Sequence, residues 1–130
     1  MVEFDGIDIV AADIKIPGVD ALLGSALYDG EMEIYLAVLQ AFMESIPAVI
    51  DKLRNVSEAD LGNYANVVHG FCGSCASIGA EQLRERAFVL EKKSKAGDFS
   101  GIPALNYALI KNASTLVSDI EAFLTSLSTR

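Results

Sequence analysis

Apolar residues recur every three or four positions along most of this 130-residue chain. On an α-helix that spacing gathers side chains onto one face, so the pattern predicts amphipathic helices. The first long stripe follows Asp29-Gly30, and its apolar members are Tyr35, Leu39, Phe42, Ile46, Val49 or Ile50, and Leu53. Pro47 lies within this stripe, and we expect a kink there because proline removes a backbone donor and clashes with the preceding turn.

Three more stripes follow, separated by short segments that break the pattern. Gly79 ends the second stripe, Ala96-Gly97-Asp98 ends the third, and Pro103 marks the first turn of the fourth, a position that suits proline. The apolar members of these three stripes are, in order, Leu61, Tyr64, Val68, Phe71, Cys75 and Ile78; Leu83, Ala87 and Leu90, widened by Phe88 and Val89; and Leu105, Leu109, Leu116, Ile120, Phe123 or Leu124, and Leu127.

Together these elements predict an all-α fold. A shorter helix is expected over Val19 to Tyr28, between Pro17-Gly18 and Asp29-Gly30. Four amphipathic helices with short connections turn back on one another, so we expect an antiparallel four-helix bundle with a short additional N-terminal helix. Residues 1–16 alternate loosely between apolar and acidic, and we assign them as an N-terminal tail or linker ahead of a bundle domain over residues 17–130.

Composition and charge narrow the classes of function. With 52% hydrophobic and 22% charged residues the chain is not intrinsically disordered. Mean hydropathy is +0.35, yet no uninterrupted apolar run approaches the ~20 residues of a membrane span. The net charge of −8 repels phosphate groups, so we expect neither nucleic acid nor a membrane as a partner. Two cysteines without an export signal are expected to be reduced thiols in the cytoplasm.

The single histidine, His69, carries the candidate chemistry. At about 100° per residue it lies near the edge of the buried face of its helix, where an imidazole is accessible. Its helical neighbours are small, and glycine inside a helix costs about 1 kcal/mol relative to alanine. These neighbours are Gly62, Ala65, Asn66, Gly70, Gly73 and Ala76. These small side chains would let another protein's surface reach the His69 ring. From the helical wheel alone, however, a surface histidine without a function is the simpler interpretation.

The residues around and after His69 form a recognisable series. Gly73 and Ser74 stand four and five positions on, Gly79-Ala80 ten and eleven, and Leu90-Glu91 twenty-one and twenty-two. This series resembles the signature of histidine-containing phosphotransfer (HPt) domains, which act in multistep two-component phosphorelays and hybrid sensor kinases. Upstream residues also resemble the start of such a module, so that the resemblance spans about residues 16–127; they are Ile16 to Asp20, Tyr35, Leu39 and Phe42.

The resemblance implies a function and a partner. His69 would accept a phosphoryl group from the aspartyl phosphate of a receiver domain, in a response regulator or a hybrid histidine kinase, and pass it reversibly to another receiver. Gly73 would stay small so that the receiver can approach. We expect a monomeric phosphoryl carrier without kinase activity or a cofactor of its own, with Mg²⁺ bound only by the receiver.

One residue departs from the family pattern. Cys72 stands where the family has a lysine, which places a cation near the phosphoryl oxygens. Either another cation substitutes, or the phosphohistidine is less favoured, or transfer is reduced. On the following helix Arg86 and Lys92 lie at about the right height to be such a cation. The alternative hypothesis is a lapsed phosphoacceptor that serves as a helical binding module for a receiver or a kinase.

A metal site is a weaker interpretation of the same helix. His69, Cys72 and Cys75 are spaced by three, which places them one above another on a helix. Structural zinc sites use four ligands, however, and the chain has no further histidine or cysteine. Cys75 also lies in the core stripe, where a free thiol behaves as a small apolar group. We therefore predict no metal.

Overall fold

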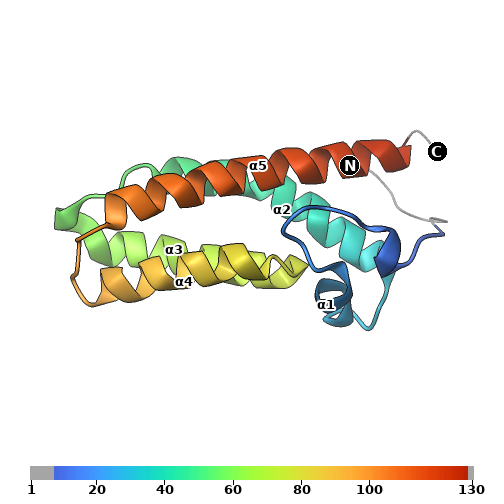
Figure 1. The fold of residues 1–130 in the computed structure, drawn as a ribbon, viewed down its shortest axis with the longest axis horizontal. Helices are drawn as coiled ribbons and strands as arrows, with labels where there is room; N and C mark the ends of the chain where they lie inside the picture. The colour runs from blue at the N-terminus through green and yellow to red at the C-terminus, as the bar shows by residue number, and fades with distance from the viewer. Residues whose placement is uncertain (1–7, 129–130) are drawn as a thin grey trace.

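The computed structural model describes residues 8–128, and every regular element in that part of the chain is helical. The elements are η1 (Ala11–Asp13), α1 (Ala21–Ala26), α2 (Met32–Leu53), η2 (Glu58–Asp60), α3 (Leu61–Ile78), α4 (Glu81–Lys95) and α5 (Ile102–Ser128). Figure 1 shows the four long helices as an antiparallel bundle with α1 at one end. The all-α bundle predicted from periodicity is confirmed.

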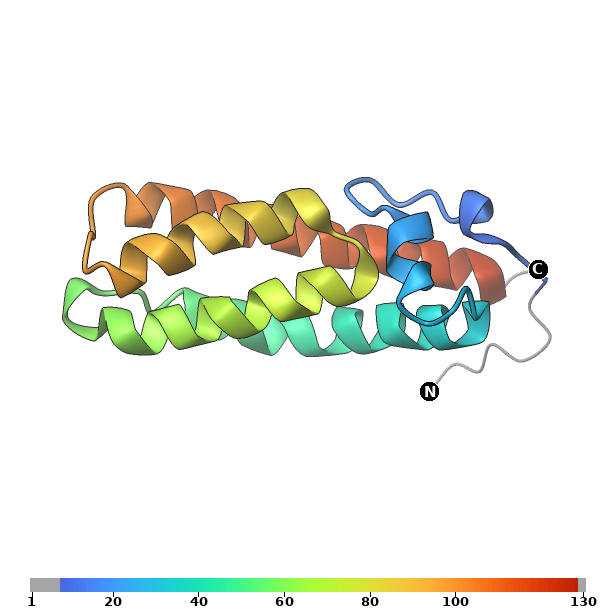
Figure 2. The same ribbon diagram turned by 90° about the horizontal axis from the view of Figure 1, so that it is seen from below.

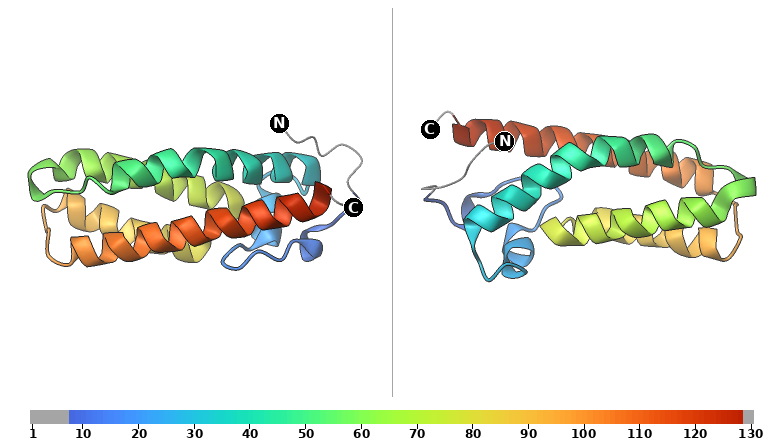
Figure 3. Two further views of the ribbon diagram at one scale, coloured as in Figure 1. Left: turned by 90° about the horizontal axis from the view of Figure 1, so that it is seen from above. Right: turned by 180° about the vertical axis from the view of Figure 1, so that it is seen from behind.

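The bundle consists of two helix pairs of unequal length. The shorter pair is the α3–α4 hairpin, and the longer pair is α2 and α5, which pack against each other. α2 and α5 extend beyond the turn of the hairpin, and α1 with the preceding segment occupies the space beyond that turn (Figures 1 and 2). Helix α2 continues through Pro47, and its ribbon changes direction along its length (Figure 3).

The stripes supply the core, with small shifts of register. Of the alternatives left open, Ile50 is more deeply buried than Val49, and Leu124 than Phe123. Leu105 is 43% exposed because its neighbour Asn106 takes the inward position, accepting a hydrogen bond from the Tyr64 hydroxyl at 2.5 Å. Phe88 and Val89 are each 49% exposed, so the third stripe is narrower than we predicted from sequence.

The carbonyl groups at the end of α3 are satisfied by tyrosines. Tyr35 of α2 donates its hydroxyl to the Ile78 carbonyl at 2.7 Å, and Tyr28 donates to the Ser77 carbonyl at 2.8 Å. A helix leaves its last carbonyls without partners along the helix, and a buried end needs other donors. These two hydroxyls therefore fix the position at which α3 ends.

Two glycines allow α1 to pack closely against that end. Gly79 ends α3 with a φ of +82°, and its carbonyl accepts from the Asp20 amide at 2.9 Å. A Cβ at Gly79 would overlap the Asp20 carbonyl, and a Cβ at Gly24 would lie 2.5 Å from the Ile78 carbonyl oxygen. We refer to Asp20, Gly24, Ile78 and Gly79 as the α1–α3 junction.

The N-terminal segment is part of the folded structure from its first described residues. Ile9, Ile14 and Ile16 are 4–6% exposed and belong to the same core as the bundle helices. These three side chains hold residues 9–16 against the bundle. Residues 1–7 lie outside the described part of the chain.

By length and composition, one helix within residues 8–128 passes as a membrane span. It is α2, and 39% of its most apolar window is buried inside the bundle. Tyr35, Leu36, Leu39 and Ile46 of α2 are completely buried. A core helix of a bundle passes the same test, so one such helix is weak evidence for a membrane span.

Candidate functional site

His69 lies on the outer side of α3, and its side chain is 72% exposed. Its Nδ1 is 2.8 Å from Oε2 of Glu91, a residue of α4 whose side chain is only 6% exposed. Because an ionised carboxylate only accepts hydrogen bonds, Nδ1 carries the proton and donates it to Glu91. The neutral ring then keeps a lone pair on Nε2, on a side chain that is open to solvent.

The Glu91 carboxylate contacts both the His69 ring and a lysine. Lys95, one turn further along α4, places Nζ 2.6 Å from the same Oε2. The hydrogen bond from Lys95, with a smaller contribution from His69, lowers the pKa of Glu91 even though its burial acts in the opposite direction. Glu91 therefore remains a carboxylate at neutral pH, and its buried charge is paired.

The thiol of Cys72 completes this group. Its Sγ lies 3.9 Å from Oε1 of Glu91 and 3.8 Å from the Arg84 carbonyl oxygen. Burial, together with the charge of Glu91, raises the pKa of Cys72 to about 11, so the thiol is neutral at pH 7. It cannot supply the positive charge of a lysine. We refer to His69, Cys72, Glu91 and Lys95 as the His69 cluster.

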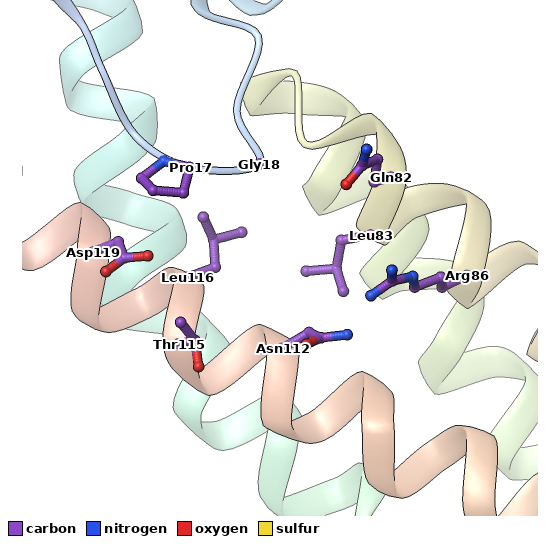
Figure 4. A pocket seen from close by; sticks show the side chains of 9 residues that line it. All are labelled: Pro17, Gly18, Gln82, Leu83, Arg86, Asn112, Thr115, Leu116 and Asp119. Atoms are coloured by element: carbon purple, nitrogen blue, oxygen red, sulfur yellow. The ribbon is translucent and has the colours of Figure 1, made fainter.

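The two candidate cations of α4, Arg86 and Lys92, lie in different surroundings. Arg86 lines a cavity of about 180 Å³ that also contacts Pro17 and Asn112, on the side of α4 that faces α5 (Figure 4). Lys92 lies over the Phe88 ring, 5.5 Å from its centroid. Lys95, which the sequence pattern did not single out, shares the Glu91 carboxylate with His69. Its signal was present, since an acid and a lysine spaced i and i+4 on a helix lie side by side.

The small residues around His69 divide into open and packed positions. Gly62, Gly70 and Gly73 are exposed, and a Cβ at any of them would have no atom within 4 Å. Asn66 is also exposed, and Ala76 is half-buried. Ala65, which we predicted to belong to the docking surface, is 3% exposed because it lies on the core side of α3. We call Gly62, Gly70 and Gly73 the glycine strip.

The second thiol is a core residue. Cys75 is fully buried, and burial raises its pKa to about 12. Within residues 8–128 no group of three or more histidine, cysteine, aspartate or glutamate side chains is arranged to hold a metal ion. The series of His69, Cys72 and Cys75 thus separates into an exposed imidazole, a half-buried thiol and a core thiol.

Comparison with known families identifies the arrangement. A family model described as Hpt domain matches residues 37–125, which is more than half of the chain and contains the whole His69 cluster. The chain belongs to the Hpt domain family. Comparisons with curated proteins and with solved structures each give no match. Hpt domains carry phosphoryl groups on histidine in phosphorelays, interact with receiver domains, and are phosphocarrier modules rather than kinases. The membership of the HPt family that we inferred from the sequence is therefore confirmed.

Proposed function

We propose that His69 accepts a phosphoryl group from the aspartyl phosphate of a receiver domain and passes it to a second receiver, in a reversible relay. The observation that carries this proposal is the hydrogen bond between Nδ1 and Glu91, which leaves the lone pair of the exposed Nε2 free for attack. An imidazole whose nucleophilic nitrogen was buried or bonded to the protein would have no such use.

The chemical step is an in-line exchange of one bond for another. The Nε2 lone pair attacks phosphorus, an N–P bond forms, and the P–O bond to the aspartate breaks, releasing its carboxylate. No proton has to leave Nε2, but the ring gains positive charge because Nδ1 keeps its hydrogen. The Glu91 carboxylate, 2.8 Å from Nδ1, stabilises that charge. The aspartate of a Ser-His-Asp triad stabilises the charged histidine in the same way. The reverse step restores the neutral ring.

The chain's own residues provide only part of the site. Phosphoryl transfer depends mainly on positioning and on neutralising charge, and in this proposal the receiver contributes Mg²⁺ and the aspartate. The glycine strip would let the receiver's surface come down close to His69. Open space over Gly70 and Gly73 supports this placement, because no contact within the chain requires glycine there.

The same proposal includes a monomeric chain in the cytoplasm. A second copy covering the glycine strip would compete with the receiver for His69. Cys72 and Cys75 are free thiols, which is compatible with a reducing compartment. Sedimentation of the purified chain at several concentrations tests the monomer, and a stable dimer would contradict it.

A lapsed phosphoacceptor is the second candidate, favoured by one observation. Cys72 is a neutral thiol at the position of the family lysine, so a phosphoryl group on His69 would lack that charge. In this case the chain would bind a receiver or a kinase without carrying phosphate. Glu91 argues for the carrier, because a module used only for binding has no need for a carboxylate bonded to Nδ1.

A transfer assay separates the two candidates. The purified chain is mixed with a panel of receivers carrying ³²P-labelled aspartyl phosphate, and label on the chain is followed with time. The carrier gains label from at least one receiver, and His69→Gln, which preserves the fold, gains none. Binding to a receiver without any gain of label would establish the lapsed form instead.

A further inference from the structure

We infer that Lys95 provides the cation for the phosphoryl group on His69, in place of the lysine that Cys72 has replaced. This inference rests on the proposed function, and it assigns a role to a residue one turn beyond the family motif Leu90-Glu91. The motif Leu90-Glu91 contains no basic residue, and Lys95 lies four residues after Glu91.

The geometry brings the ammonium group close to the ring. Oε2 of Glu91 lies 2.8 Å from His69 Nδ1 and 2.6 Å from Lys95 Nζ. Because both nitrogens contact the same oxygen, they must lie close to each other. Lys95 is on the exposed side of α4, with 60% of its side chain accessible. A lysine has a flexible four-carbon stem and three donors, so it can reach a group bound to the same ring without moving its helix.

The charges change in the direction that would move Lys95. A phosphoryl group on nitrogen adds between one and two negative charges and three strong acceptor oxygens next to the ring. The Lys95 side chain is 60% exposed, so its ammonium group can turn from Glu91 toward the phosphoryl oxygens while it stays in contact with solvent. Glu91 stays paired after the exchange, because the Nδ1 proton of His69 still donates to it.

The other cations of α4 are engaged elsewhere. Arg84 makes two hydrogen bonds to Glu81, at 2.8 and 3.0 Å, and Lys93 binds Asp98 at 2.9 Å. Arg86 and Lys92 face the cavity and the Phe88 ring, as described above. Lys95 is therefore the α4 cation that shares a partner with His69.

The test uses phosphohistidine made without a receiver. Phosphoramidate transfers its phosphoryl group to an exposed imidazole and releases ammonia, so it labels wild type, Lys95→Gln and the matched control Lys93→Gln alike. The pH midpoint of the second phosphoryl ionisation is then followed by ³¹P NMR. A nearby cation favours the dianion, so Lys95→Gln raises the midpoint by about half a unit. Lys93→Gln leaves it unchanged.

A second-site variant separates charge from structure. Cys72→Lys restores the family lysine, and combined with Lys95→Gln it returns the midpoint to the wild-type value if both lysines do the same work. Equal midpoints in wild type, Lys95→Gln and Lys93→Gln would overturn the inference about Lys95. If phosphoramidate labels the chain but no receiver does, the proposed relay fails while the Lys95 result stands; if the reagent leaves His69 unlabelled, both fail.

Discussion

Glycine serves opposite purposes at the α1–α3 junction and in the glycine strip. At the α1–α3 junction, Gly24 and Gly79 are glycine because backbone atoms occupy the space that a side chain would take. In the glycine strip, nothing within the chain lies near that space. The fold requires glycine at the junction. The glycines of the strip lower the stability of the helix, and no packing contact requires them. Exposed glycines beside a reactive side chain therefore indicate a surface where a partner protein docks.

The two regions also differ in what holds them. The junction depends on neutral groups: the hydroxyls of Tyr28 and Tyr35 and the backbone of Asp20. The His69 cluster depends on a buried carboxylate with two cationic or potentially cationic partners. One region is therefore built for permanent packing, and the other contains charges that can be redistributed when a phosphoryl group arrives.

The largest expected effect is at the junction. Gly79→Ala forces a side chain into a φ of +82° and against the Asp20 carbonyl, so the free energy of unfolding falls by about 3 kcal/mol. Urea denaturation followed by circular dichroism measures the change. If Gly79→Ala and Gly62→Ala changed the free energy of unfolding by the same amount and in the same direction, the two sets of glycines would not differ.

Gly73→Arg tests the other region. The helix tolerates arginine, because a Cβ there has open space, but the long charged side chain obstructs the receiver. Phosphoryl transfer from a receiver slows by about thirtyfold or more, which corresponds to about 2 kcal/mol, the loss expected at an interface hot spot. Labelling by phosphoramidate serves as the control, since it needs no docking and stays at the wild-type rate. Normal transfer in this variant would remove the strip from the interface.

Acid should loosen the His69 cluster before the junction. The pKa of Glu91 is lowered in the folded state, so the stability it provides is complete above the ordinary glutamate value of 4.5 and is lost as pH falls through its folded pKa. Burial raises the pKa of Tyr35, whose hydroxyl stays protonated throughout this range. Glu91→Gln should flatten the dependence of unfolding free energy on pH below 4.5. An unchanged slope in that variant contradicts this account of the cluster.

The smallest effect, of opposite sign, is expected for alanine in the strip. Gly70→Ala and Gly62→Ala each raise the free energy of unfolding by about 0.5–1 kcal/mol, because alanine restricts the unfolded chain and meets no atom in the fold. Urea denaturation again gives the value. Destabilisation by either substitution would show a packing role that the open space does not reveal.

Much of the fold follows from periodicity, since an apolar stripe specifies which face of a helix is buried. Gly79 correctly marks the end of α3, and His69 falls at the exposed edge as predicted. Sequence reasoning failed where the rotation of one helix against another decides the outcome. Ala65 was assigned as a helical neighbour of His69, but it is 3% exposed because it lies on the core side of α3. Arg86 and Lys92 were chosen by their height along α4, which does not reveal that one lines a cavity and the other lies over the Phe88 ring.

The cluster around Glu91 could not be assembled from the pattern for a related reason. A buried acid within an apolar stripe looks like an interruption until its partners across the hairpin are known. Glu91 is 4% exposed and meets His69 from another helix, twenty-two residues away in sequence. Likewise, the isoleucines of residues 9–16 are spaced irregularly, so no period identified them as core.

The central claim is that Nε2 of His69 is the atom that receives the phosphoryl group while Nδ1 keeps its proton for Glu91. Long-range ¹H–¹⁵N correlation of the ¹⁵N-labelled chain, recorded before and after phosphorylation by an active receiver, identifies the nitrogen that bears phosphorus. The structure predicts phosphorus on Nε2 and a protonated Nδ1 in the same spectrum. Phosphorus on Nδ1, or on any residue other than His69, would contradict the account.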